Sequence, residues 1–269
     1  MISVRFVPGL RCALLCSAAL AASEDYDCIA EARQLVEIRS PVEGLIEQVT
    51  VDRGDAVKKG QILVTLESGP ERAALAIARS RAAMVGPVEA AQARVEFSKT
   101  KEKRQDELYR QNFVSSSAVD EARTERKLAE SELRVARENQ EQAQLEVKRA
   151  EELLNMRTLR SPFSGVVVQR VLKAGEFATS NVKEPILKLA EVDPLNVEVV
   201  LPASLYGKIK LGDRAEVMPE TPNNRYPARV VVVDRVIDAA SGTFGVRLEL
   251  RNPNNLIPAG AKCKLRFLR

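Results

Sequence analysis

The chain has 269 residues, of which 45% are hydrophobic and 29% are charged, an ordinary balance for a water-soluble protein. Its 41 basic residues are interleaved with 37 acidic ones and form no basic stripe with interleaved aromatic residues, which argues against nucleic-acid binding. Histidine, the commonest general base and metal ligand, is absent, and an aromatic content of 4% favours thin modules and long helices over one bulky enzyme core.

The first 22 residues have the pattern of a secretory signal peptide. Arg5 and Arg11 precede a run of apolar or small residues, 12–22, which is shorter than the roughly 20 residues that a membrane-spanning helix needs. We therefore expect residues 1–22 to direct export out of the cytosol. An uncleaved membrane anchor is the alternative that the pattern leaves open.

Export bears on the two cysteines that lie outside this leader, Cys28 and Cys263. An oxidising compartment favours disulfides, and a Cys28–Cys263 bridge would tie the two ends of the mature chain together. Two buried free thiols are the alternative, because spacing in the sequence does not show whether the two Cα atoms come within bonding distance.

A short sequence motif, called the repeated phrase below, occurs twice in the chain, 121 positions apart. Residues 40–46 read SPVEGLI and residues 161–167 read SPFSGVV, and the match continues to a second glycine and an acidic residue after it. The matched pairs are Ser40 with Ser161, Pro41 with Pro162, Gly44 with Gly165, Gln48 with Gln169, Gly54 with Gly175 and Asp55 with Glu176. The repeat predicts that segments 23–70 and 159–191 contain the two halves of one small β-domain.

The insertion between these halves, residues 71–158, has the pattern of two long helices. In its second part, mostly apolar residues recur at alternating steps of three and four, which is the heptad seam of a coiled coil. The seam residues are Val119, Ala122, Arg126, Ala129, Leu133, Ala136, Gln140, Ala143, Val147, Ala150 and Leu154. A helix from about 116 to 158 would be on the order of 60 Å long.

The stretch before that helix begins a similar stripe, which Gly86-Pro87 interrupts. Proline removes a backbone amide and clashes with the preceding turn, so we expect a kink or a short break there. Beyond Val95 the stripe is expected to fade. Residues 111–117, QNFVSSS, then supply a reversal, and Ser116 or Ser117 is expected to cap the second helix. The insertion is therefore predicted to be an antiparallel hairpin.

Residues 40–67, SPVEGLIEQVTVDRGDAVKKGQILVTLE, alternate apolar and polar residues and resemble half of a lipoyl (biotinyl-lipoyl) motif. An enzyme carrier domain of that kind bears a modified lysine where its halves join, but here the helical insertion occupies the join. A lipoyl motif split by an α-hairpin resembles the periplasmic adaptors, or membrane fusion proteins, of the HlyD and RND-efflux type. Residues 192–202 and 228–268 are similar to the opening and closing parts of the β-barrel of that family.

The hairpin turn carries a further resemblance to this family. Adaptors that dock onto a TolC-type outer-membrane channel are similar to one another in an Arg, a Leu four positions later and a Ser seven positions after the Leu. Arg104, Leu108 and Ser115 stand at these spacings, and Val114 lies in the turn itself. The resemblance implies that Arg104 offers a forked donor, Leu108 an apolar contact and Ser115 a small polar contact. A surface pair of helical residues plus a helix cap is the alternative.

The resemblance implies an α+β protein that is elongated and modular. Its parts are a signal peptide (1–22), a split lipoyl-like β-sandwich (23–70 and 159–191), a long antiparallel α-helical hairpin forming a coiled coil (71–158) and a small β-barrel (192–269). The implied function is that of a non-enzymatic adaptor with no cofactor or metal. Its expected partners are a TolC-type channel, an inner-membrane transporter of the RND or ABC type, and copies of itself in a hexameric ring.

The expected location is the periplasm of a Gram-negative cell envelope, in association with the inner membrane. A structural envelope protein that uses its coiled-coil hairpin to hold a partner is the alternative function. The two differ in what the hairpin turn contacts: an outer-membrane channel for the adaptor, and another envelope component for the structural protein.

Overall fold

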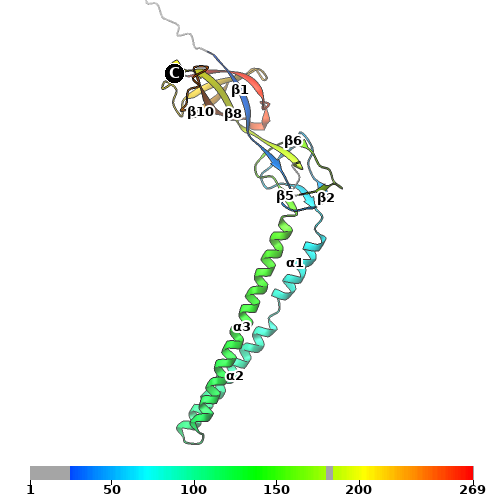
Figure 1. Cartoon of the computed structure of the whole chain (residues 1–269), viewed down its shortest axis with the longest axis vertical. Coiled ribbons are helices and arrows are strands. Elements are labelled where there is room, and N and C mark those ends of the chain that lie inside the picture. The colour runs from blue at the N-terminus through cyan, green and yellow to red at the C-terminus, as the bar shows by residue number, and fades with distance from the viewer. Residues whose placement is uncertain (1–24, 180–183, 269) are drawn as a thin grey trace, which may run out of the picture. The chain divides into compact units, whose positions relative to one another are not determined.

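The structure, a computed structural model, describes residues 25–179 and 184–268 (Figure 1). The predicted signal peptide, residues 1–22, lies outside the described residues. The predicted α+β architecture is confirmed, since a β-barrel, a split β-domain and a long helical hairpin are all present. Two long strands, β1 (Tyr26–Ile38) and β8 (Leu187–Pro202), contribute to both the barrel and the β-domain.

One compact unit combines the chain before Gln34 with Val192–Arg269 and forms a six-stranded barrel. Neighbouring strands follow the order β1-β12-β9-β10-β11-β8, and β1 also pairs with β8, which closes the barrel. The remaining elements are β9 (Arg214–Pro219), β10 (Tyr226–Val233), β11 (Thr243–Leu250), β12 (Ala261–Phe267) and two 3-10 helices, η1 (Ala203–Leu205) and η2 (Pro253–Asn255). Alternate side chains point inward, so Phe244, Val246 and Leu248 of β11 are buried.

The other unit, Gln34–Glu191, contains the β-domain and the hairpin. One group of strands has the order β5-β4-β2-β7 and another has the order β3-β6-β8. The short strands are β2 (Gly44–Val49), β3 (Ala56–Val57), β4 (Ile62–Leu66), β5 (Thr158–Arg160), β6 (Gly165–Arg170) and β7 (Phe177–Ala178). Fourteen buried apolar residues from these strands and the loops between them form one core.

The two copies of the repeated phrase exchange strands with each other. In one ladder β2 pairs with β7, where Leu45 stands opposite Phe177; in the other β6 pairs with β3, where Val166 stands opposite Ala56. Each residue of the second pair is the repeat counterpart of one in the first. Each copy therefore completes the fold of the other, which explains why the phrase occurs twice.

The second glycine of each copy lies in a turn, and this turn has the same conformation in both halves of the β-domain. Gly54 and Gly175 have φ values of 92° and 87°, a conformation that favours glycine. The acidic residue that follows accepts a hydrogen bond from the backbone N–H three positions before it, at 2.7 Å for Asp55 and 2.8 Å for Glu176. The repeated glycine and carboxylate thus specify the same backbone reversal in both halves.

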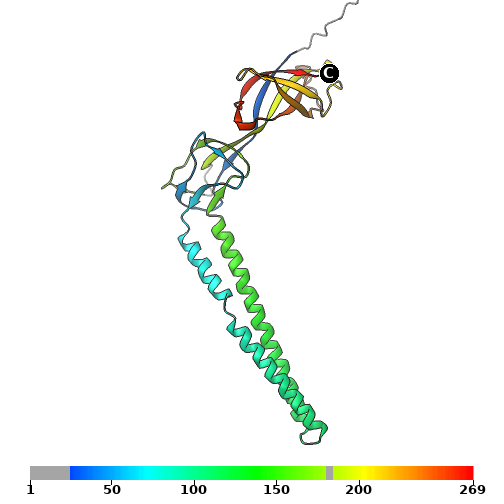
Figure 2. The same cartoon turned by 180° about the vertical axis from the view of Figure 1, so that it is seen from behind.

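The hairpin consists of α1 (Gly69–Ala82), α2 (Gly86–Arg110) and α3 (Ser116–Asn155). First α1 and then α2 lie alongside α3, as both views show (Figures 1 and 2). The expected interruption takes the form of a break over residues 83–85. Pro87 then falls in the first turn of α2, where its missing N–H leaves no helical hydrogen bond unmade.

The predicted heptad seam of α3 is confirmed, because all eleven of its residues are buried or half-buried. Toward the turn, Val119, Ala122, Ala129 and Leu133 are buried. From Ala136 onward the seam residues are only half-buried. The helices therefore pack more tightly near the turn than near the β-domain.

On α2, the apolar stripe fades beyond Val95 as expected, but the inward-facing positions do not end there. The inward positions continue at steps of three and four through Ser98, Glu102 and Gln105, all buried or half-buried. Glu102 Oε2 lies 2.6 Å from Arg126 Nε on α3. The seam continues as a polar one, which an apolar pattern cannot reveal.

Arg157 fastens the end of the hairpin to the β-domain. Its guanidinium donates to Glu71 Oε1, at 2.5 and 3.0 Å, and to the carbonyl oxygen of Glu43 at 2.7 Å. A Cβ on Gly44 would lie 2.5 Å from Nη1 of this arginine. The first glycine of the repeated phrase therefore leaves the space that the Arg157 side chain occupies.

Candidate docking site at the hairpin turn

A Schellman-type ending of α2 reverses the chain at the hairpin turn. The N–H of Phe113 donates to the carbonyl of Leu108, and the N–H of Asn112 donates to that of Tyr109, both at 2.9 Å. Asn112 has a φ of 61°, the left-handed conformation that this motif requires and that asparagine adopts more readily than most residues. The local sequence therefore specifies where α2 ends.

Ser115 caps α3. Its backbone is extended, with φ −79° and ψ 158°, and its Oγ accepts a hydrogen bond from the N–H of Ala118 at 3.4 Å. The expectation that Ser116 or Ser117 caps this helix is wrong, because both lie inside the helix. The Ser115 hydroxyl thus helps to hold the turn while its side chain stays exposed.

The four residues predicted at the docking site lie in the last two turns of α2, in the turn and directly before α3. Arg104 and Leu108 are four residues apart, so their side chains share one side of α2. Arg104 and Ser115 are exposed, and Leu108 and Val114 are half-buried. The structure therefore gathers the four within one end of the hairpin.

Two aromatic residues at this end were not singled out from the sequence as docking residues. Phe113 is 74% exposed and Tyr109 is 46% exposed. In a Schellman motif the residue at the position of Phe113 often packs back on the helix, but here most of this side chain faces solvent. Exposed aromatic side chains are typical anchors of protein interfaces. Only 4% of the residues in the chain are aromatic, so two aromatic residues within positions 109–113 could have marked this turn as a binding site.

Ion pairs between α2 and α3 hold this end of the hairpin in register. Lys101 Nζ lies 2.7 Å from Glu125 Oε2, and Glu102 pairs with Arg126 as described. The hydrogen bond to Glu125 raises the pKa of Lys101 above its ordinary value. Because exposed ion pairs contribute little net stability, their main effect is to select the alignment of the two helices.

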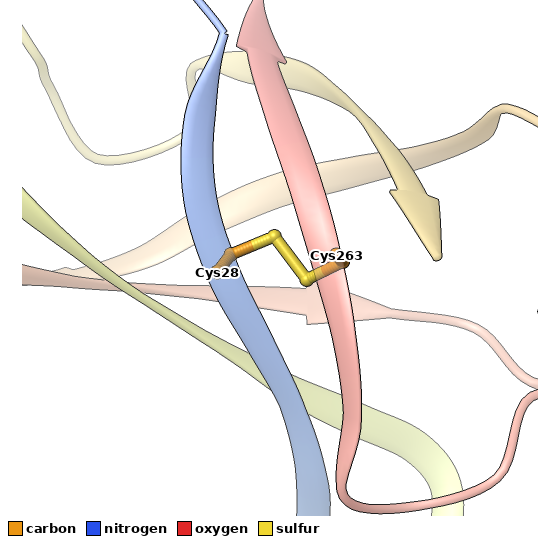
Figure 3. Close-up of a disulfide and its surroundings, with 2 residues drawn as sticks. All are labelled: Cys28 and Cys263. Atoms are coloured by element: carbon orange, nitrogen blue, oxygen red, sulfur yellow. A yellow bond between two sulfur atoms is a disulfide. The ribbon is translucent and has the colours of Figure 1, made fainter. Parts of the chain in front are cut away.

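The predicted cysteine pair lies in the barrel. Cys28 of β1 stands directly opposite Cys263 of β12, and their sulfur atoms are bonded (Figure 3). Their Cα atoms are 4.9 Å apart, within the usual range for a disulfide, and both side chains are buried. The bond joins the first and last strands of the barrel, 235 positions apart in the sequence.

Within residues 25–179 and 184–268, no three cysteine, aspartate or glutamate side chains are grouped as ligands for a metal ion. No helix in the same part of the chain combines the length and the apolar run needed to cross a bilayer. The side chains at the hairpin turn can instead bind a partner protein through apolar contacts and through the guanidinium of Arg104.

Comparison with known proteins agrees with this architecture. The sequence family described as CzcB-like, barrel-sandwich hybrid domain, matches residues 34–190. The multidrug resistance protein MdtE of Escherichia coli strain K12 is 27% identical over 239 residues, which cover 84% of this chain and 59% of MdtE. The cobalt-zinc-cadmium resistance protein CzcB of Cupriavidus metallidurans is 23% identical over 210 residues, 78% of this chain and 38% of CzcB.

The crystal structure of MacA from Actinobacillus actinomycetemcomitans has the same fold. It matches with a TM-score of 0.73 and 22% identity, over 91% of this chain and 78% of MacA. The chain spans less than two thirds of the length of the curated relatives MdtE and CzcB. Because the matched family covers more than half of the chain, this protein belongs to the periplasmic adaptor, or membrane fusion protein, family, whose members are not enzymes.

Proposed function

We propose that this chain is a periplasmic adaptor that links an inner-membrane transporter to a TolC-type outer-membrane channel for efflux or secretion. The observation that carries the proposal is the hairpin turn, where Tyr109 and Phe113 are exposed beside half-buried Leu108 and Val114. This apolar surface lies at the start of a 40-residue helix, α3. A few apolar anchors on a rigid element are sufficient to hold a partner protein.

In this proposal the residues at the turn have different roles in binding the channel. Leu108, Val114 and Phe113 enter apolar pockets of the channel, and Arg104 donates paired hydrogen bonds to carbonyl or carboxylate oxygens there. Ser115 contributes mainly by holding the backbone of the turn through its cap. The Cys28–Cys263 bridge keeps the barrel closed.

The relatives support a role in transport. The names of two relatives describe multidrug resistance for MdtE and cobalt, zinc and cadmium resistance for CzcB. We place this chain in the periplasm of a Gram-negative envelope, exported by a signal peptide at residues 1–22 and associated with the inner membrane. There it serves a transporter of the RND or ABC type as a hexameric ring.

A photo-crosslinking residue at Val114, used in intact cells, tests the proposal. We expect it to capture an outer-membrane channel protein. The matched control places the same residue at Glu141, an exposed position on α3 far from the turn, where no channel should be captured. Capture of only soluble envelope proteins at Val114 would contradict the adaptor role and favour a structural envelope protein that holds a partner with its hairpin.

The Phe113→Ser variant tests docking to the channel without removing the hydrogen bonds that form the turn. The substitution removes exposed apolar surface but keeps the N–H group that donates to Leu108. Loss of an interface anchor costs about 2 kcal/mol or more, which is roughly thirtyfold weaker binding, so we expect export to fall strongly at unchanged protein abundance. Normal export by this variant would show that the aromatic side chain does not anchor the partner.

A further inference from the structure

Two loops lie side by side at one end of the barrel. Residues 203–213 connect β8 to β9, and residues 234–242 connect β10 to β11. Pro202, directly before the first loop, stands opposite Thr243, directly after the second. The two loops, called the loop end below, therefore cover the same end of the barrel.

Exposed apolar side chains are concentrated on the loop end. Its exposed large apolar residues are Tyr206, Leu211, Val236 and Ile237. The two most exposed of them are Leu211, at 69%, and Val236, at 78%. The loops 220–225 and 251–260 at the opposite end are fully described and expose one such residue, Leu256. Folding of the barrel therefore leaves one of its two ends apolar.

A four-residue turn, 210–213, has Leu211 at its second position. In this turn a side-chain oxygen of the fourth residue accepts a hydrogen bond from the N–H of the first at 2.8 Å, and the third residue is a glycine with positive φ. The same turn occurs three times in the β-domain, at 52–55, 58–61 and 173–176. The residues at the second position there are Arg53, Lys59 and Ala174. The turn therefore requires no apolar residue at this position, and its conformation does not explain the exposed leucine.

A basic residue precedes the most exposed apolar residue of each loop. Lys210 precedes Leu211, and Arg235 precedes Val236. These two basic side chains and that of Lys208 are exposed, and none of the three forms an ion pair with another described residue. Each loop thus presents an apolar side chain with a positive charge next to it.

The acidic residues of the loop end are held by the barrel itself. Asp213 accepts the hydrogen bond of the turn described above, and Asp238 Oδ1 accepts one from the N–H of Ala240 at 2.8 Å. The Asp234 carboxylate lies over Gly245 of β11, where a Cβ would collide with it. The carboxylates are therefore engaged within the barrel, whereas the basic side chains can meet a negatively charged partner.

We propose that the loop end binds the surface of a lipid bilayer that contains anionic phospholipids. Leu211 and Val236 enter the boundary between the head groups and the acyl chains, where apolar side chains of peripheral proteins are buried. Lys208, Lys210 and Arg235 contact the phosphate groups of the lipids, to which basic residues at a membrane surface are attracted.

The composition of the loop end favours lipid over a protein partner. Anchors of protein interfaces are enriched in Trp, Tyr and Arg and poor in Leu and Val, yet Leu211 and Val236 are the most exposed residues here. Tyr206 is partly exposed, and its ring packs edge-on against Phe244 with the ring centroids 5.3 Å apart. Tyrosine is enriched at the boundary between membrane and water, because its ring is apolar and its hydroxyl is polar.

Strand β1 begins at the same end of the barrel. Its first residue, Tyr26, stands opposite Leu265 near the end of β12, and the N–H of Leu268 donates to the carbonyl of Arg214, directly after the first loop. The apolar run 12–22, which we expect to enter the inner membrane as a leader or as an anchor, precedes β1 in the chain. The inference rests on the proposed location beside that membrane, and it names the surface that meets the lipid.

A single introduced tryptophan tests the contact, because the chain has no tryptophan of its own. The exported protein with Val236→Trp is purified and mixed with vesicles of phosphatidylglycerol and phosphatidylethanolamine in equal amounts. We expect its fluorescence emission to shift to shorter wavelength, since the side chain leaves water. The control, Leu256→Trp, places the reporter on an exposed residue at the opposite end and should show no shift. No shift at position 236, or an equal shift at position 256, would overturn the proposal.

Flotation with the same vesicles measures the strength of binding without a reporter. Leu211→Ala introduces the residue that the equivalent turn 173–176 already carries, so the turn should be preserved. Combined with Val236→Ala, it should weaken binding about tenfold or more, because less apolar area enters the membrane. Leu256→Ala, the matched control, should bind like the parent protein. Equal binding by the parent and the combined variant would contradict the insertion of these side chains.

Removal of the basic side chains tests the electrostatic part. Lys208→Gln, Lys210→Gln and Arg235→Gln together should weaken binding about a hundredfold at low salt and make the remaining binding nearly independent of salt. Lys262→Gln, an exposed residue of β12, serves as the control and should have little effect. The parent protein should bind only weakly to vesicles of phosphatidylcholine alone, which carry no net charge. Equal binding to both kinds of vesicle would refute the contact with anionic lipid.

Two further outcomes separate this inference from a protein contact and from the proposed function. If the parent protein does not bind vesicles but the loop variants lose export in cells, the loop end contacts a protein and the lipid proposal is overturned. Channel capture at Val114 without vesicle binding would leave the adaptor role in place and remove the lipid contact. Vesicle binding without channel capture would leave the lipid contact in place and remove the docking proposal.

Discussion

The two parts of the unit Gln34–Glu191 are held together in different ways. In the β-domain, fourteen buried apolar residues form one core. In the hairpin, the corresponding cluster contains only Val95, Ala129 and Leu133, and most of the remaining seam is small or polar. Because apolar burial is the main favourable term in folding, the β-domain stabilises itself, whereas the hairpin gains little from its own seam.

The large apolar side chains of the hairpin lie outside its seam. Large side chains such as Phe97 and Leu128 are present in its sequence, but they lie on the outer faces and not in the seam. A hairpin built in this way depends on its anchorage to the β-domain more than on its own seam. Four substitutions measure each part of this contrast, from the largest expected effect to the smallest.

Leu63→Ala measures the core of the β-domain. The Leu63 side chain is fully buried, so its truncation leaves a cavity and should lower the free energy of unfolding by about 3 kcal/mol. The matched change in the hairpin, Leu128→Ala, removes the same atoms from an exposed site and should change it by less than about 0.5 kcal/mol in dilute monomer. Urea unfolding of both variants checks this; equal losses would refute the contrast.

Arg157→Ala measures the anchor between the two parts. The substitution removes the hydrogen bonds to Glu71 and to the Glu43 carbonyl, and it leaves a largely buried carboxylate without its partner. We expect a loss of about 2 kcal/mol. Hydrogen exchange should show the loss first in α1 and in the end of α3. Arg149→Ala, at an exposed position of α3, serves as the control and should leave both readouts unchanged.

Gln105→Leu tests whether the polar seam weakens the hairpin. Gln105 Oε1 is buried and has no hydrogen-bond partner among the described residues, so an apolar replacement should stabilise the hairpin by about 1 kcal/mol. The control, Gln111→Leu, changes an exposed residue and should give no gain. Thermal unfolding followed by helical circular dichroism provides the measurement. A destabilised Gln105→Leu variant would mean that this amide has a partner that outweighs its burial.

Glu37→Gln probes a surface contribution to the β-domain and has the smallest expected effect. Hydrogen bonds from Arg39 and then from Lys188 hold the pKa of Glu37 below its ordinary value of 4.5. A lowered pKa stabilises the folded state above pH 4.5, and this contribution is lost as the pH falls through the folded-state pKa. The unfolding temperature of the parent protein should therefore drop slightly more than that of the variant between pH 6 and pH 3. Parallel pH profiles would show that these hydrogen bonds add no stability.

Several features could be predicted from the sequence because they depend on residues close together in the chain. The seam of α3 follows from spacing alone, and all its residues face inward. The break beside Pro87 follows from a missing amide. The repeat marked a β-domain split by an insertion, and its glycines Gly54 and Gly175 adopt the positive φ that such turns need.

Other features depended on the backbone in three dimensions. Ser115, and not Ser116 or Ser117, caps α3, because the choice among adjacent serines depends on where the Schellman turn ends. Glu102 and Gln105 could not be recognised as seam residues from the sequence, because a polar seam leaves no periodic pattern of apolar residues. The exposure of Phe113 also could not be read from its residue type, which usually indicates burial.

The sequence by itself determined the periodic helices and the duplicated turn, because local periodicity and backbone propensity are properties of neighbouring residues. Tertiary structure decided which strands the two copies exchange, that Arg157 lies across Gly44, and that Cys28 stands opposite Cys263. These contacts join residues more than a hundred positions apart, and only closure of the β-domain and of the barrel brings them together.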